Sequence, residues 1–245
     1  MLRRAGFFHF AESHCNPLGE LAKAMSEVSP AIDLADSLIV LPEGFNLGRA
    51  YDLSNNPKEK PRFHERCVLE CLRQIAARCE VVFVVSVIEI DTERNSAYFV
   101  DAGTPRLMCH KIIDDQSREY ELCTIDCQGE NPVTCPEEMW IGALICADAL
   151  DNRPTHCEGV EAAYQRLHSL QSSLCGKRNL VCVPAHMDTK SNDPPMCGGG
   201  LILANSRPGF SSLIKDRNGD RLPMPEGLQN HIHLENICRI MAEEK

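Results

Sequence analysis

Short apolar runs alternate with segments of helical periodicity along most of the chain. Apolar residues recur three or four positions apart over Pro17–Val28, His64–Ala77 and Glu158–Cys175, which predicts three amphipathic helices. The third ends near Gly176, a residue type that often terminates helices. Turn-forming residues are spread between the segments and are not gathered into a linker. We therefore expect a single domain over residues 1–245.

The remaining apolar runs have the length and composition of β-strands. Val81–Ile90 is strongly β-branched, and Ser96–Val100 and Arg106–His110 flank the turn DAGT, which predicts a hairpin. Further strands are predicted at Ala5–Phe10, Ser37–Leu41, Trp140–Ile145, Leu180–Val183, Leu201–Asn205 and Ser211–Lys215. Because strand–helix units and hairpins occur together, the expected fold class is α/β with mixed sheets.

The composition is that of an ordinary globular protein, with 43% hydrophobic and 24% charged residues. The net charge of −10 argues against nucleic acid or an anionic membrane as the main partner, because both attract basic surfaces. The longest apolar run, around Val81–Val87, is only as long as a strand. The N-terminus lacks the apolar region and cleavage site of a signal peptide, so we expect a cytoplasmic protein.

The chain contains 14 cysteines, far below the density of a small disulfide scaffold. Most are expected to be buried free thiols, which behave as small hydrophobic residues. Cys67 and Cys71 lie four positions apart on one helix face and are expected in the core. Cys79, Cys182 and Cys238 lie in similar apolar or helical patterns.

Metal binding is the natural alternative for a cysteine-rich chain. Cys123 and Cys127 have the spacing of half a zinc motif, with Cys135 nearby, but the matching second half is missing. His231 and His233 alternate along a predicted strand, a pattern typical of a solvated sheet edge. The pattern therefore favours the absence of a metal site.

Three predicted strands each deliver one reactive residue at their ends. These residues are Glu43 in LIVLPEGF, Lys111 in RLMCHKI and Cys146 in IGALICADALD. Ligands of α/β sheets bind at strand ends, so the three side chains are expected to converge. Together they suit acyl transfer: the thiolate attacks a carbonyl or nitrile carbon, the carboxylate takes the thiol proton, and the ammonium neutralises the oxyanion.

The same segments resemble those of the nitrilase, or carbon–nitrogen hydrolase, superfamily. The similarity covers LIVLPEGF, the hairpin NSAYFVDAGTPRLMCHKI and IGALICADALD, in that order. It continues through LVCVPAHM and NSRPGFSSLIKDRNGD, to about residue 222. The resemblance implies a four-layer α-β-β-α sandwich that hydrolyses a non-peptide C–N bond without metal or organic cofactor. It implies Glu43 as general base, Lys111 as oxyanion stabiliser and Cys146 as nucleophile.

The resemblance also implies supporting residues around this trio. A second glutamate lies after the lysine, where Glu119 is preferred over Glu121. The backbone N–H of Ala147 would help to bind the oxyanion, and its small side chain would open space near the thiol. Asp148 fits a structural anchor. For His186, after the strand in LVCVPAHM, a structural role is favoured over a place in the pocket.

The sequence departs from the superfamily between VPAHM and LILANS, where a Gly/Pro-rich loop replaces a helix that helps to build the pocket and the subunit contact. The expected substrate is a small amide, with nitriles and N-carbamoyl compounds as alternatives, and a homodimer or higher homo-oligomer is expected. Acyl transfer to an amine or thiol remains open. So does a catalytically degenerate protein that binds a ligand or partner.

Overall fold

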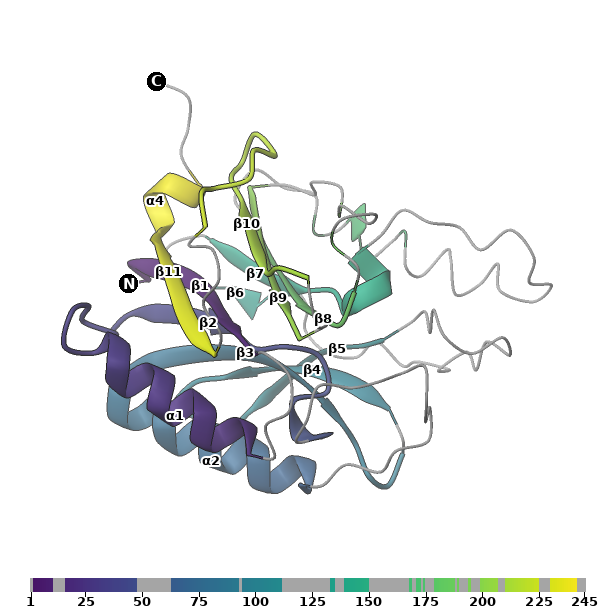
Figure 1. Ribbon diagram of the computed structural model, residues 1–245. Helices are drawn as coiled ribbons and strands as arrows, with labels where there is room; N and C mark the ends of the chain where they lie inside the picture. The colour runs from purple at the N-terminus through teal and green to yellow at the C-terminus, as the bar shows by residue number, and fades with distance from the viewer. Residues whose placement is uncertain are drawn as a thin grey trace.

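A computed structural model shows two β-sheets stacked face to face, with helices against one of them (Figure 1). The structure describes residues 2–10, 16–47, 63–92, 94–111, 133–134, 139–149, 168, 171–172, 174, 179–187, 189, 194, 199–206, 210–224 and 230–241. All structural statements below concern these residues.

The first sheet has six strands in the order β11-β1-β2-β3-β4-β5. Its strands are β1 (Arg4–His9), β2 (Ser37–Val40), β3 (Val81–Ile88), β4 (Asn95–Val100), β5 (Arg106–His110) and β11 (His231–Asn236). β1, β2 and β3 are parallel, whereas β3–β4, β4–β5 and β1–β11 are antiparallel pairs. The predicted mixed sheet and the predicted hairpin are therefore confirmed.

The second sheet has five strands in the order β10-β9-β8-β7-β6. Its strands are β6 (Val133–Thr134), β7 (Trp140–Ala143), β8 (Asn179–Ala185), β9 (Gly200–Asn205) and β10 (Leu213–Lys215). β7, β8 and β9 run parallel. β7 ends two residues before the predicted boundary, because the chain leaves the ladder to form a 3₁₀ turn, η2 (Cys146–Ala149).

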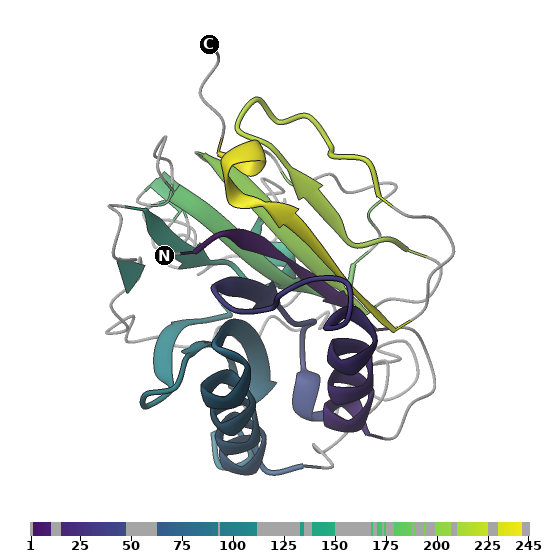
Figure 2. The same ribbon diagram turned by 90° about the vertical axis from the view of Figure 1, so that its left-hand side faces the viewer.

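Two helices, α1 (Pro17–Val28) and α2 (Glu65–Cys79), lie side by side on the outer face of the six-stranded sheet (Figures 1 and 2). α1 begins after Asn16, whose side-chain oxygen accepts a hydrogen bond from the Gly19 N–H at 3.0 Å. α2 ends at Glu80, which adopts a left-handed conformation. A short helix, α4 (Ile237–Ile240), follows β11. Of the predicted helix 158–175, the four described residues are helical.

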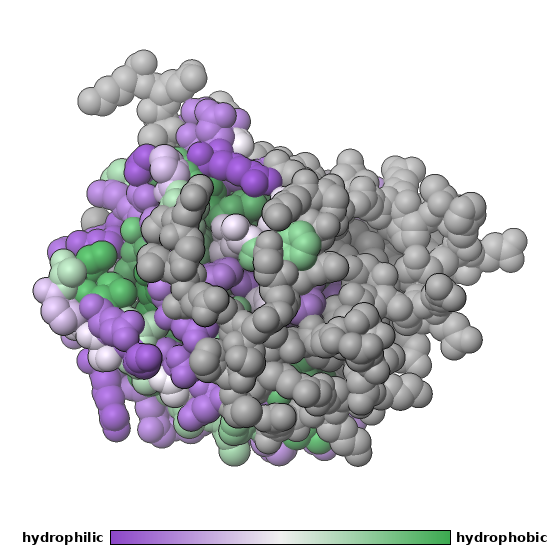
Figure 3. Space-filling model, viewed as in Figure 1, coloured by the Kyte–Doolittle hydropathy of each residue, from purple (hydrophilic) through white to green (hydrophobic). Residues whose placement is uncertain are grey.

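Two hydrophobic clusters match these layers. One fills the space between the sheets and includes Val40, Val84 and Val181, and the other lies between the six-stranded sheet and the helices and includes Leu21 and Leu72. The alternation of strand side chains explains the division, because successive residues point to opposite faces. The result is an α/β sandwich. Hydrophilic side chains dominate the described surface around α1 (Figure 3), and no described helix is long and apolar enough to cross a bilayer.

The prediction that the cysteines of α2 lie in the core is wrong. Cys67 and Cys71 are exposed, because α2 buries a neighbouring stripe that includes Val68 and Leu72. Cys238 is also exposed and Cys79 is half-buried, whereas Cys182 is buried as expected.

The histidines of β11 do not form a solvated edge, although β11 is an edge strand. Their side chains lie on the face that carries Phe7: the His233 ring stacks on Phe7 at 5.7 Å and the His231 ring meets it edge-on at 6.2 Å. The expectation of solvation is wrong because β11 pairs with β1 in a register that turns both imidazoles inward. Burial lowers the pKa of His233 despite the opposing charge of Glu235.

Gly6 in β1 allows β11 to approach closely, and its replacement by alanine is expected to destabilise the protein. A Cβ atom there would lie 1.8 Å from the backbone oxygen of His233, so the two strands would have to separate. We expect a loss of about 2 kcal/mol or more in the free energy of unfolding, measured by urea denaturation. Gly103→Ala is the control, since its Cβ would meet only the Asp101 side chain, at 3.0 Å. Equal stability of the two variants would contradict this account.

Candidate active site

The ends of four strands converge between the two sheets. β5 lies against β7, and β2 lies against β8 and β9. β5 runs parallel to β2 and β3, because two antiparallel pairings separate β3 from β5. The carboxyl ends of β2 and β5 therefore share one edge of the first sheet, and those of β7 and β8 share one edge of the second. Glu43, Lys111 and Cys146 follow β2, β5 and β7.

Local structure fixes the turn that carries Glu43. Gly44 has φ +60, a left-handed conformation that glycine adopts without steric cost. The Asn46 side chain then binds β3 twice: its Nδ2 donates to the Ile88 carbonyl at 2.7 Å, and its Oδ1 accepts from the Ile88 N–H at 2.8 Å. The Gly44 N–H also donates to Ser86 Oγ at 3.3 Å. The carboxylate is thus presented from a rigid turn.

Glu43 and Lys111 form a buried ion pair. Lys111 Nζ lies 2.8 Å from Glu43 Oε1, and each side chain is 10% exposed. Asn95 Nδ2 donates to the same oxygen at 2.7 Å, and Ser86 Oγ donates to Asn95 Oδ1. The Lys111 N–H in turn donates to the Asn95 carbonyl at 2.8 Å, which continues the hairpin ladder to the lysine.

Cys146 is fully buried at the first position of η2. Its φ of +50 is left-handed, which costs about 1–3 kcal/mol for a residue with a side chain. Backbone hydrogen bonds hold this turn on both sides: Leu144 N–H donates to the Cys182 carbonyl at 3.1 Å, and Asp148 N–H donates to the Ile145 carbonyl at 3.0 Å. Asp148, for which an anchoring role is predicted, is buried.

The charges of the site favour an ionised Glu43. Burial alone would raise the pKa of its carboxyl. The charge of Lys111, hydrogen bonds from Lys111 and the Cys146 thiol, and the charge of His186 outweigh burial and hold this pKa below its ordinary value. The site therefore combines a paired carboxylate and ammonium with a buried thiol nearby, in a volume largely shielded from water.

Sequence reasoning missed Asn95, and with it Ser86 and Asn46. The signal for Asn95 was a polar side chain at the start of an apolar hairpin strand, on the same face as Ala97. Glu119 and Glu121 lie outside the described residues, as do Cys123, Cys127 and Cys135. The backbone of Ala147 lies in η2, but its side chain lies outside the described part. No group of three or more potential metal ligands occurs among the residues that the structure describes.

No family model matches this sequence, and no curated protein matches it. Solved structures do match it. A variant of the amidase from Nesterenkonia sp. AN1, which shows Michael addition of acrylamide at its active-site cysteine, has a TM-score of 0.58 at 16% identity, covering 95% of this chain and 91% of that one. The chain has the nitrilase fold. The similarity that the sequence motifs indicate is thereby confirmed for the fold.

Two further structures with this nitrilase fold carry molecules at their sites. A variant of the same Nesterenkonia amidase, in complex with butyramide, has a TM-score of 0.58 at 16% identity, with 95% and 89% of the two chains covered. A CN-hydrolase superfamily protein from Xanthomonas campestris, with an arsenic adduct in its active site, has a TM-score of 0.57 at 13% identity and the same coverage.

Proposed function

We propose that this protein hydrolyses a non-peptide carbon–nitrogen bond in a small amide through a thioester on Cys146. The observation that carries the proposal is the buried Glu43–Lys111 pair, 2.8 Å apart, with the Cys146 thiol near enough to help lower the pKa of the same carboxyl. An amide substrate is supported by the butyramide and acrylamide bound to an amidase of the same fold. We also propose a cytoplasmic homo-oligomer.

The first half-reaction forms the acyl-enzyme. Glu43 accepts the thiol proton as Cys146 Sγ forms a bond to the amide carbon. The carbonyl oxygen becomes an oxyanion, which the Lys111 ammonium and the backbone N–H of Ala147 stabilise. The C–N bond then breaks, and the proton held by Glu43 passes to the leaving nitrogen. Ammonia or an amine departs, and Cys146 remains as a thioester.

The second half-reaction regenerates the thiol. Glu43, again ionised, takes a proton from a water molecule as the water oxygen attacks the thioester carbon. The C–S bond breaks, the proton returns to the Cys146 sulfur, and the carboxylic acid leaves. The lowered pKa of Glu43 keeps the base ionised at neutral pH, so both halves can begin without a change of pH.

The proposal is tested by ammonia release from a panel of small amides, N-carbamoyl compounds and nitriles. Protein alkylated by iodoacetamide is the inactive control, and mass spectrometry of peptides identifies the modified thiol. We expect release from at least one amide, and faster alkylation of Cys146 than of exposed Cys67 near neutral pH. A Cys146 that reacts no faster than Cys67, together with no release, would refute the proposal and favour a ligand-binding protein.

Replacing Asn95 by alanine is expected to lower kcat/KM by about 10- to 100-fold, since a hydrogen bond to a charged group contributes about 1.5–3 kcal/mol. Loss of the Nδ2 donor also raises the pKa of Glu43, so the acidic limb of the pH–rate profile should move to higher pH. Asn230→Gly is the control, because it removes a similar amide–carboxylate contact, with Glu20 at 3.2 Å. An unchanged acidic limb in Asn95→Ala would show that Asn95 does not act on Glu43.

A further inference from the structure

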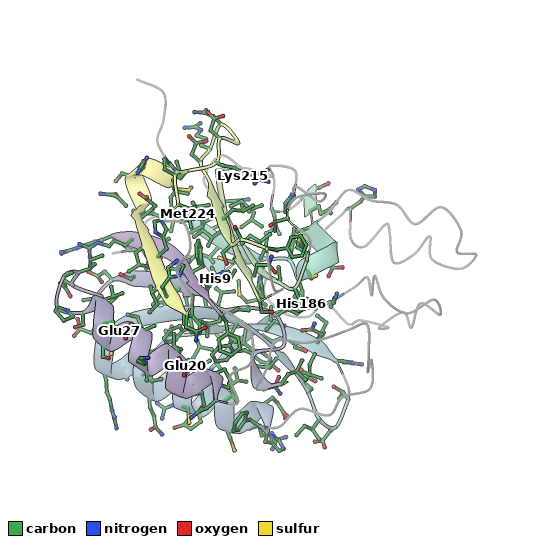
Figure 4. All side chains as sticks on the ribbon, in the orientation of Figure 1. His9, Glu20, Glu27, His186, Lys215 and Met224 are labelled. Atoms are coloured by element: carbon green, nitrogen blue, oxygen red, sulfur yellow. The ribbon has the colours of Figure 1, made fainter. Side chains whose placement is uncertain are left out.

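His186 lies at a fourth strand end beside the site. It follows β8 directly, and β8 is the parallel neighbour of β7, after which Cys146 lies. β8 also lies against β2, whose end leads to Glu43. Figure 4 shows His186 close to the gap between the two sheets, at the end where β8 finishes. The imidazole is thus delivered to the same place as the other three side chains.

The backbone around His186 is held on both sides. Ser206 N–H donates to the Ala185 carbonyl at 3.1 Å. Asn205, which is fully buried, bonds twice to Met187: its Oδ1 accepts from the Met187 N–H at 3.1 Å, and its Nδ2 donates to the Met187 carbonyl at 2.9 Å. Hydrogen bonds from the end of β9 therefore hold the backbone on both sides of His186.

The side chain of His186 is fixed as well. It is 6% exposed, and its Nδ1 lies 3.0 Å from Ser206 Oγ. A hydrogen bond at one ring nitrogen sets the direction in which the other points. Because Ser206 directly follows β9 of the second sheet, the ring is anchored to that sheet, and the charge of His186 is among the causes that lower the pKa of Glu43.

His9 provides a comparison for His186, because it makes a similar contact with a serine away from the candidate site. Its Nδ1 lies at the same 3.0 Å from a serine, Ser212 Oγ, and its side chain is half-buried. Burial and then the charge of His231 lower the pKa of His9 to about 4, so its surroundings disfavour a positive charge. His186 differs because a carboxylate, Glu43, lies within range of its charge.

We propose that His186 is a positioning residue of the candidate site, oriented by Ser206 so that its imidazolium, beside Lys111, stabilises the Glu43 carboxylate. Among the described residues, the groups that act on Glu43 come from four places: Lys111 after β5, Asn95 from β4, Cys146 from η2 and His186 after β8. The catalytic consequence rests on the proposed function, whereas the electrostatic effect on Glu43 does not.

The test is the pH dependence of Cys146 alkylation by iodoacetamide, followed by peptide mass spectrometry in the full-length protein. The variants are His186→Gln and Ser206→Ala, with His9→Gln as the matched control. We expect the acid-side midpoint to rise by about 0.5–1 pH unit in His186→Gln, because Glu43 loses a cation. A smaller rise is expected in Ser206→Ala, which keeps the imidazole but frees its orientation, and none in His9→Gln.

The outcomes separate this inference from the proposed function. If Cys146 is alkylated rapidly in the wild type and the midpoint pH is the same in His186→Gln, the role of His186 is overturned, whereas the proposed hydrolase is not. Slow alkylation of Cys146 in the wild type argues against the proposed hydrolase. The role of His186 is then tested by measuring the pKa of the Glu43 carboxyl with carbon NMR in the same variants. Circular dichroism checks that the variants are folded. If His186→Gln is unfolded, the proposal is tested with Ser206→Ala, and an unchanged alkylation midpoint in that variant overturns it.

Discussion

Cys146→Ala is expected to reduce amide hydrolysis by about 10⁴-fold or more, because the thioester cannot form without a nucleophile. The fold should survive, since the change removes one sulfur atom from a buried position and leaves the carboxylate and ammonium paired at 2.8 Å. Ammonia release under saturating amide measures the loss. Intact-mass spectrometry of quenched reactions should show an acyl adduct in the wild type and none in the variant.

Cys182→Ala is the matched control for that prediction. Cys182 is also a fully buried cysteine, one strand away on β8, where it pairs with Ala143 of β7. We expect this variant to keep activity within a few-fold and to lose about 1 kcal/mol or less in stability, as for other small losses of core volume. Equal activity of Cys146→Ala and wild type would exclude the thioester route.

Lys111→Met is expected to be the second most damaging substitution, in two separate ways. Loss of the oxyanion-stabilising ammonium should lower kcat by about 10²–10³-fold. Loss of the cation also leaves the Glu43 carboxylate buried without its main partner, which should cost about 3–5 kcal/mol of stability at neutral pH. Ammonia release measures the first effect and urea unfolding the second.

The contribution of Glu43 to the free energy of unfolding should depend on pH in the opposite direction in Lys111→Met. In the wild type the pKa of Glu43 is lowered, so its stabilising contribution is present above the unfolded pKa and is lost as pH falls. Without Lys111, burial dominates and raises this pKa. The contribution is then greatest below the unfolded pKa and is lost as pH rises through the folded pKa. Urea unfolding at pH 5 and pH 8 measures the difference.

Lys215→Met provides the control for the lysine. Lys215 is 4% exposed, and its ammonium donates to the Pro194 carbonyl at 2.6 Å. It is not among the groups that shift the pKa of Glu43, so we expect Lys215→Met to lower stability while Glu43 keeps the pH dependence that it has in the wild type. If Lys111→Met also left the pH dependence due to Glu43 unchanged, the ion pair with Glu43 would have no electrostatic importance.

Most helices and strands of the fold could be predicted from local sequence patterns. The helix Pro17–Val28 was predicted to the residue, because its apolar spacing and its proline start are both local signals. The hairpin β4–β5 and the ends that carry Glu43 and Lys111 were predicted for the same reason. Strand Trp140–Ile145 was predicted too long, because Leu144 and Ile145 are apolar and buried but lie outside the ladder.

The wrong predictions concern which neighbours pack against a helix or strand, because a local sequence pattern carries no information about distant segments. The faces of Cys67 and His233 depend on which neighbour packs there: α2 turns Cys67 to solvent, and β1 turns His233 inward. Asn95 was not predicted, and His186 was given a structural role, for a similar reason. The bond from Asn95 to Glu43 joins residues distant in sequence, which a local pattern does not reveal.

The division of the site between the two sheets has a consequence for the folding chain. Glu43 and Lys111 come from one sheet, whereas Cys146 and His186 come from the other. A partly folded chain in which only one sheet has formed holds a thiol without its base, or a base without its thiol. Among 14 cysteines, Cys146 therefore acquires its special environment only when the sheets dock. Selective alkylation of Cys146 can accordingly serve as a probe of completed folding, independent of any substrate.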